Sequence, residues 1–379
     1  MKNSAAKKER RSLVRLLIES DGAISVLVVL LGFLCGTILV LCVGRNPGNM
    51  YKAILQGCTG WNIDRGTWNV RYVGEWLNYS VPFILCGLAM AFAARAGLFN
   101  IGGEGQYIAG VTVAQLIALL GPQVPVLHWL LAVCGAIVIG ALWGGVVGYL
   151  KARFEVSEVV ATIMLNYIAL YLSRIVIFAI PGTNTYRTVD FPETALLSAG
   201  FLQSLTNGSN LNLGFFMALL AVLFYWFFME KTKYGFALRA TGFNKDAARC
   251  SGIPVVASIV ASMAIAGAFA GLGGGIVALG SFKYGRVLSG MDNYGFTGIA
   301  VALVGNNTAG GTLLAGLLFG LLAAAQPIMQ LRQIPKEITF IIQGLIVVFI
   351  ALRSGIRMFL VWQQKRASEK QSAQEVSRG

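Results

Sequence analysis

The polar side chains that could do chemistry lie in or beside long apolar segments. A glycine-rich stretch and two apolar runs carry them: Phe99, Asn100, Glu104, Asn166 and Gln343. Amides can bind a sugar hydroxyl or the edge of a base, and an aromatic ring can stack on a flat ligand. A carboxylate among apolar residues of a membrane protein is costly and is often functional. These five residues are therefore predicted to line a substrate path.

Structural roles for the same residues stay open. Glu104 could bind backbone amides at a helix N-terminus, and Asn or Gln in a membrane can hydrogen-bond one helix to another. Four glycines in the nine residues from Gly97 to Gly105 favour a broken helix at this point. Neither a Walker A loop nor a dinucleotide fingerprint fits, because no Gly-Lys-Ser/Thr follows and no βαβ pattern surrounds the glycines.

Catalytic and metal-binding patterns do not occur in the sequence. The single histidine, His128, stands beside Trp129 at the end of an apolar run, which is typical of a membrane interface. Six cysteines show no paired spacing, so neither a disulfide framework nor a metal site is expected. The sequence predicts a protein that is not an enzyme and that holds no cofactor or metal of its own.

A second candidate site is the basic segment 231–254 between two apolar runs. Asn244 is a good N-cap, Asp246 would lie in the first helical turn, and Gly252 with Pro254 would end the helix. These residues predict a short amphipathic helix over about 245–251. Such a helix offers a docking surface; the alternative is a solvated connector.

The elements that must position these residues follow from the composition. Hydrophobic residues make up 56% of the 379 residues and charged residues 12%, about half the charged share of soluble domains. The apolar runs long enough to suggest helical spans lie near 23–43, 76–95, 101–120, 126–150, 157–180, 213–230, 255–280, 293–306, 310–328 and 338–360. The sequence therefore predicts an all-α polytopic bundle of about ten spans, or of eight or nine, because the run at 293–306 is too short to cross alone.

The basic residues predict the orientation of this bundle. With the N-terminus in the cytoplasm, about 20 Lys and Arg lie inside and 9 outside, as the positive-inside rule requires. The formal charge of +14 is spread over short segments, which argues against a nucleic-acid partner. We expect a basic cytoplasmic N-terminus at 1–22, a membrane domain at 23–360, and a cytoplasmic tail at 361–379. The segments 44–75 and 181–212 are predicted as outside loops.

Two internal patterns concern the packing of the bundle. Glu158 to Arg174 and Glu337 to Arg353 share length, end charges and a central amide, and they would run in opposite directions, as an inverted repeat requires. Glycines also recur at four-residue spacing, which allows membrane helices to approach closely. The glycines in question are Gly140, Gly144, Gly148, Gly267, Gly271, Gly275, Gly316 and Gly320.

Several segments resemble a known transporter family. The stretch from Gly97 to Gln106 and the segment Gly298–Gly305 are similar to signatures of the ABC importer permeases that handle simple sugars, nucleosides and branched-chain amino acids. The basic segment 231–254 resembles the coupling loop of that family. The matching residues are Gly235, Ala237, Leu238, Arg239, Ala240, Gly242, Asn244, Ala247, Ala248, Gly252 and Ile253. With Thr162–Tyr167, the pattern is most similar to the nucleoside-uptake branch.

The resemblance implies a type II importer-like permease in the bacterial cytoplasmic membrane, importing a nucleoside or a related simple sugar. It implies a second, homologous permease chain, an extracytoplasmic substrate-binding lipoprotein, and a cytoplasmic ABC ATPase that binds ATP and Mg. The residues expected to couple to that ATPase are Arg239, Gly242, Asn244, Asp246, Ala247, Ala248, Arg249 and Gly252.

Two alternatives from other classes remain. An intramembrane enzyme would need a catalytic constellation, which the sequence does not show. An ion-coupled secondary transporter of a small polar solute would need a charged site in the middle of the membrane. Glu104 with Arg174 is the candidate pair for such a site.

Overall fold

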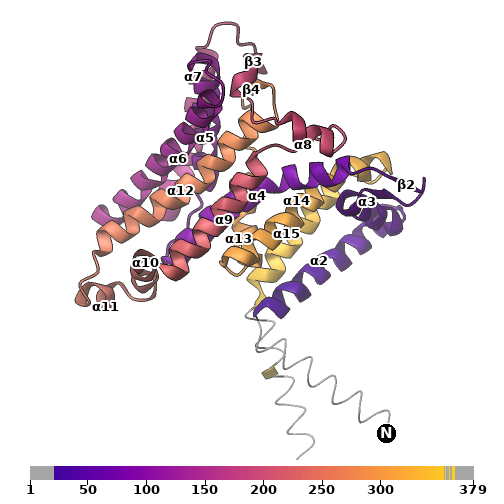
Figure 1. The fold of residues 1–379 in the computed structure, drawn as a ribbon. Coiled ribbons are helices and arrows are strands. Elements are labelled where there is room, and N and C mark those ends of the chain that lie inside the picture. Colours follow the sequence, from indigo (N-terminus) through magenta and orange to yellow (C-terminus); the bar gives the residue numbers. More distant parts are fainter. Residues whose placement is uncertain (1–20, 354, 356–357, 359–360, 363–379) are drawn as a thin grey trace, which may run out of the picture. The chain divides into compact units, whose positions relative to one another are not determined.

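The structure, a computed structural model, describes residues 21–353, 355, 358 and 361–362 (Figure 1). The predicted ends 1–22 and 361–379 lie almost entirely outside the described residues. The described chain is mostly helical, because a helix satisfies its own backbone groups in lipid. The long helices are α2 (Asp21–Cys42), α4 (Arg71–Arg95), α5 (Gly103–Leu120), α6 (Leu127–Phe154), α7 (Glu158–Phe178), α9 (Gly214–Lys231), α12 (Val255–Gly280) and α14 (Ala309–Leu331).

The shorter elements lie between these helices or follow them. They are α3 (Pro47–Thr59), β1 (Trp61–Asn62), β2 (Thr67–Trp68), β3 (Arg187–Asp190), η1 (Glu193–Ala195), α8 (Gly200–Leu205), α10 (Lys233–Phe243), α11 (Lys245–Cys250), β4 (Tyr284–Arg286), α13 (Tyr294–Val304) and α15 (Glu337–Ala351). The strands form two antiparallel pairs, β1 with β2 and β3 with β4. The predicted all-α membrane bundle is confirmed, with these two small ribbons added.

The span prediction agrees broadly with the structure. Among the described residues, seven helices are long and apolar enough to cross a membrane: α2, α4, α6, α7, α9, α12 and α14. The other three predicted runs correspond to α5, α13 and α15. Because α13 has 11 residues, it reaches about 17 Å and cannot cross a core of about 30 Å, as its run predicted.

The chain divides into two compact units, and the smaller one contains α2 and α15. The described parts of Met1–Pro47 and Glu337–Gly379 form this unit. Glycines on α2 make room for isoleucines of α15: a Cβ built on Gly36 would lie 2.5 Å from Cδ1 of Ile342. The predicted domain boundaries at 23 and 360 stay a prediction.

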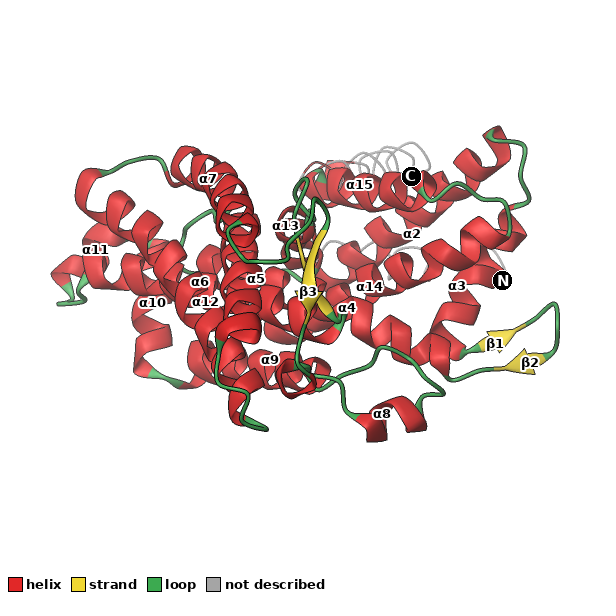
Figure 2. Cartoon of the chain, turned by 90° about the horizontal axis from the view of Figure 1, so that it is seen from above, coloured by secondary structure: helices red, strands yellow, loops and turns green. Residues whose placement is uncertain are grey.

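The larger unit, Gly48–Lys336, is built around α4 and α12. Helices α13 and α14 pack on α4, whereas α5 and α6 pack on α12 (Figure 2). The largest fully buried side chains of its core include Tyr107, Tyr225, Phe92 and Phe319. Many apolar side chains of α6, α7 and α9 are exposed instead, as expected for surfaces that face lipid or another subunit.

The predicted glycine contacts hold the α6–α12 pair together. A Cβ on Gly140 would lie 2.8 Å from the Cα of Gly271, and one on Gly148 would lie 2.9 Å from the Cα of Val260. No side chain larger than hydrogen fits at such distances. The two backbones therefore pack directly against each other, as glycines at four-residue spacing predict. The inverted repeat stays a prediction.

The segment 44–75 differs from the loop that was predicted. It contains α3, the β1–β2 hairpin and the first turn of α4. Asp64 of the hairpin accepts a 2.6 Å hydrogen bond from Lys52 Nζ and pairs with Arg332 at the end of α14. The Lys52 and Arg332 hydrogen bonds hold the pKa of Asp64 below its ordinary value. Polar residues concealed α3 and the first turn of α4 from a search for apolar runs.

Candidate functional site

A break between α4 and α5 forms the centre of the site. The carbonyl of Ala93 accepts hydrogen bonds from the N–H groups of Ala96 and Leu98, both at 3.0 Å. Gly97 adopts φ +74°, in the left-handed region that favours glycine, and α5 begins only at Gly103. The predicted helix break is confirmed.

The segment 231–254 folds as two short helices, α10 and α11. Asn244 lies between them, and its Oδ1 accepts hydrogen bonds from the N–H groups of Asp246 and Ala247, both at 3.0 Å. Gly252, with φ +79°, ends α11. The predicted helix with its N-cap is confirmed, whereas α10 was not predicted.

The α10–α11 segment contacts the helix break directly. A Cβ on Gly242 of α10 would lie 2.6 Å from the carbonyl carbon of Ala96 and 2.7 Å from the nitrogen of Gly97. Glu230, at the end of α9, pairs with Arg95 of α4 and accepts a 2.6 Å hydrogen bond from Arg239 of α10. Backbone contact and shared charge thus join the exposed helices to the end of α4.

Two of the predicted path residues lie in the break itself. Asn100 is buried, and its amide forms a reciprocal pair with Gln106 at 3.0 and 3.2 Å. Its Oδ1 also accepts from the N–H of Gly102 at 3.1 Å. Phe99, in contrast, is 40% exposed, so its ring is available to a ligand or another subunit.

Asn166 and Glu104 each supply hydrogen bonds to the start of a helix. Asn166 Oδ1 accepts from the N–H of Gly105 in α5 at 2.7 Å. The Glu104 carboxylate is fully buried and accepts from the N–H groups of Asn293 and Gly295, at 2.8 and 2.7 Å, where α13 begins. These N–H groups lack partners within their own helices, so both side chains have a structural role. Their role in a substrate path stays a prediction.

Gln343 belongs to the smaller unit and lies on α15. It is buried, and its Nε2 atom has no hydrogen-bond partner among the described residues. Its place in a substrate path also stays a prediction. In the described structure no ion pair joins Glu104 to Arg174, and each Glu104 oxygen accepts a hydrogen bond from a backbone N–H group.

A partly buried charge cluster near α13 was not predicted. Arg286 of β4 forms a bidentate ion pair with Asp292, at 3.2 and 2.6 Å. The Tyr107 hydroxyl donates to Asp292 at 3.0 Å, and the Arg286 guanidinium lies 4.4 Å from the Phe282 ring centre. Arg286 was counted only as an outside charge. The signal that could have found it is an Arg and an Asp six residues apart, directly before a short apolar run.

Among the described residues, seven helices are long and apolar enough to cross a membrane, and several of them expose apolar faces, which is the fold of a multi-pass membrane protein. A family model described as "Branched-chain amino acid transport system / permease component" matches residues 72–351. The chain belongs to this permease family. The resemblance predicted from Gly97 to Gln106 and from segment 231–254 is therefore confirmed.

Curated relatives agree with this assignment. The chain is 39% identical to the guanosine ABC transporter permease protein NupP of Bacillus subtilis, over 91% of this chain and 97% of the relative. It is 36% identical to the nucleoside ABC transporter permease protein NupB of Lactococcus lactis, over 89% and 92%. It is 32% identical to the glucose ABC transporter permease protein TsgB13 of Haloferax volcanii, over 76% and 78%. Such relatives are transport subunits rather than enzymes.

Proposed function

We propose that this chain is the membrane-spanning permease subunit of an ABC importer for nucleosides. The observation that carries the proposal is its similarity, over about nine tenths of its length, to two permeases named for guanosine and nucleoside transport. The glucose permease is matched at lower identity and over less of the chain, which favours a nucleoside over a simple sugar.

The α10–α11 segment is the proposed site of ATPase coupling. In α11, Asp246 and Arg249 are exposed, and the Asn244 cap fixes the helix start. Exposed charges on a rigid, capped helix suit docking into a cleft of another subunit. The residues proposed for this contact remain Arg239, Gly242, Asn244, Asp246, Ala247, Ala248, Arg249 and Gly252.

Energy transfer would then proceed through the helix break. An ATPase that moves α11 also moves α10, and Gly242 bears on Ala96 and Gly97 at the end of α4. The first turn of α5 follows the break, and its Glu104 holds the start of α13. A rigid movement of the coupling helices can therefore reach a half-helix within the bundle, which is how alternating access would be driven.

The partners follow from this role. We expect a cytoplasmic ABC ATPase that binds ATP and Mg, a second and homologous permease chain, and an extracytoplasmic substrate-binding lipoprotein. The chain itself is expected to bind no cofactor and no nucleic acid. We place it in the bacterial cytoplasmic membrane with both termini inside, because the basic residues are concentrated on that side.

The alternative, an ion-coupled carrier, depends on Glu104. Its carboxylate is buried, as a coupling site would require, but both oxygens accept hydrogen bonds from the start of α13. That arrangement favours a structural hydrogen-bond acceptor over an exchangeable proton site.

Affinity purification with mass spectrometry tests the proposed function. The tagged chain, extracted gently from its native membrane, should carry an ABC ATPase, a second permease and a lipoprotein. The reconstituted assembly should take up radiolabelled guanosine only with ATP. Recovery of the chain alone, with uptake driven by a proton gradient, would contradict the proposal and support the carrier.

A further inference from the structure

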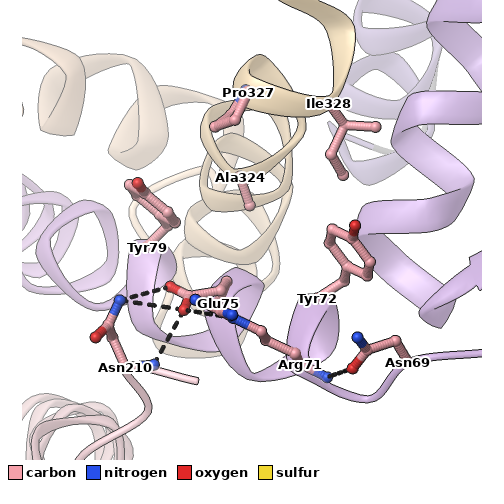
Figure 3. A pocket seen from close by; sticks show the side chains of 9 residues that line it. All are labelled: Asn69, Arg71, Tyr72, Glu75, Tyr79, Asn210, Ala324, Pro327 and Ile328. Atoms are coloured by element: carbon pink, nitrogen blue, oxygen red, sulfur yellow. Dashed lines mark hydrogen bonds and ion pairs between the residues drawn. The ribbon is translucent and has the colours of Figure 1, made fainter. Parts of the chain in front are cut away.

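A pocket of about 400 Å³ opens in the larger unit at the start of α4 (Figure 3). Its walls come from α4, from α14 and from the segment after α8, and its lining residues are Asn69, Arg71, Tyr72, Glu75, Tyr79, Asn210, Ala324, Pro327 and Ile328. The volume lies within the range of small-molecule sites.

The pocket and the coupling helices lie at opposite ends of α4. The C-terminal end of α4 meets α10 at Gly242, and its N-terminal end meets the segment after α8 at Asn210 (Figure 1). With 25 residues, α4 is about 38 Å long, enough to cross a membrane. If the coupling helices face the cytoplasm, the pocket opens on the extracytoplasmic side.

Polar and aromatic groups share one face of α4 in this pocket. Tyr72, Glu75 and Tyr79 stand at positions i, i+3 and i+7, which coincide on one side of a helix. Figure 3 shows the two tyrosine rings on either side of the pocket with Glu75 between them. Ala324 and Pro327 of α14 supply an apolar wall. The pocket thus offers two flat rings beside a carboxylate.

The two oxygens of Glu75 differ in their hydrogen bonds. Oε1 accepts from the backbone N–H of Asn210 at 3.0 Å and from its side-chain amide at 3.1 Å, whereas Oε2 has only a 3.3 Å contact with that amide. The carboxylate is therefore oriented by the protein, with capacity left on Oε2. Within the described residues, the hydroxyls of Tyr72 and Tyr79 have no hydrogen-bond partner.

The charge of the pocket suits a neutral ligand. Arg71 Nε lies 4.0 Å from Oε1 of Glu75, so the one cation and the one anion of the pocket offset each other. A phosphate would meet Oε2, which can only accept hydrogen bonds, whereas a hydroxyl can donate to it. Ribose offers vicinal hydroxyls to a carboxylate, as in nucleotide-binding proteins, and a base offers a flat face to tyrosine.

We propose that this pocket is an outward-facing nucleoside site, in which Glu75 Oε2 accepts ribose hydroxyls and Tyr72 and Tyr79 flank the base. The inference rests on the proposed function and adds to it the residues that recognise the substrate on this chain.

Photolabelling of the purified importer complex tests the site. In lipid nanodiscs, 8-azidoguanosine should label the peptide that contains Tyr72 and Tyr79, and excess guanosine should prevent the labelling. Glu75→Gln should weaken this competition by about tenfold, because a hydrogen bond to a charged acceptor is lost. Glu193→Gln, the same change outside the pocket, should leave the competition unchanged.

The outcomes separate this site from the proposed function. If the complex imports guanosine but the label lies elsewhere and Glu75→Gln competes normally, the pocket proposal fails while the importer stands. If Glu75→Gln weakens lipoprotein binding but not labelling, the pocket is a docking surface, and the proposal again fails. Absence of nucleoside uptake in the unaltered complex would instead overturn the proposed function. A normal melting temperature of Glu75→Gln excludes misfolding.

Discussion

Gly97 and Gly242 meet backbone to backbone: a Cβ on Gly97 would lie 2.8 Å from both the Cα and the carbonyl oxygen of Gly242. Two segments that are more than 140 residues apart in the sequence are thus held without intervening side chains. A movement of α10 cannot be absorbed by rotamer changes at this point, because there are no side chains to rearrange.

Gly242→Ala should uncouple ATP hydrolysis from uptake. The new methyl group would overlap Ala96 and Gly97, so α10 must shift away from the break. We expect uptake per ATP hydrolysed to fall about tenfold, measured in proteoliposomes of the full complex. Gly310→Ala is the control, because its Cβ would meet nothing within 4 Å. Unchanged coupling in Gly242→Ala would show that this contact does not transmit motion.

Local patterns predicted much of the site. The glycines around Gly97 predicted the helix break, and Asn244 with Gly252 predicted both ends of α11, because caps and left-handed glycines act within a few residues. The partner of Glu104 could not be predicted in the same way. Its hydrogen bonds reach Asn293 and Gly295, about 190 residues further along the chain, and no local pattern encodes such a pairing.

The pocket was missed for a different physical reason. The predicted span began at residue 76, because Arg71 and Glu75 interrupt the apolar run, yet α4 begins at Arg71. Their polar side chains line a pocket rather than face lipid, so hydrophobicity alone places the helix start too late. The spacing of Tyr72, Glu75 and Tyr79 along one helix face was the available signal.

Glu230→Gln tests the charged link between α9, α4 and α10. Arg95 and Arg239 share the Glu230 carboxylate at a partly exposed site, so the change should lower the free energy of unfolding by no more than about 1 kcal/mol. Coupling should nevertheless weaken, because the two arginines would no longer be held together. The measurement is the ratio of uptake rate to ATPase rate in the reconstituted complex, with Glu155→Gln as the control. Equal ratios in both variants would contradict this role.

Glu104 should tolerate Gln better than Ala. An Ala residue would leave the Asn293 and Gly295 N–H groups without acceptors, which costs about 1–3 kcal/mol for each that stays buried. Gln keeps one acceptor oxygen. In thermal unfolding of the purified complex, the unaltered protein should therefore be the most stable, Glu104→Gln less stable and Glu104→Ala the least stable. ATP-driven uptake should be retained in Glu104→Gln. Proton-driven uptake that requires Glu104 and no ATPase would support the ion-coupled carrier instead.

The Asp64 contacts predict that the β1–β2 hairpin loosens in acid. The pKa of Asp64 is lower in the folded chain than its ordinary value, because Lys52 and Arg332 donate to it. The stabilisation is therefore complete above the ordinary pKa and is lost as the pH falls through the lowered one. Acetylation of Lys52 should be slower in the unaltered chain than in Asp64→Asn, when both are measured at the same neutral pH. Equal rates would mean that the ion pair does not protect Lys52.

The exposed charges of α11 give the most direct test of ATPase docking. Asp246 and Arg249 are exposed, and the Asn244 cap bonds to backbone N–H groups rather than to their side chains, so replacing both with Ala should leave α11 folded. We expect the double variant to insert and to pair with its permease partner, yet to retain little ATPase after purification. Arg65→Ala, which alters an exposed charge of the β1–β2 hairpin, is the control. The buried residue of α11 is Ala248, which the double variant keeps, so the contact of α11 with the bundle should remain. The contact that is lost would then be the one with the ATPase. Normal ATPase recovery and normal uptake in the double variant would require the docking surface to lie elsewhere on the chain.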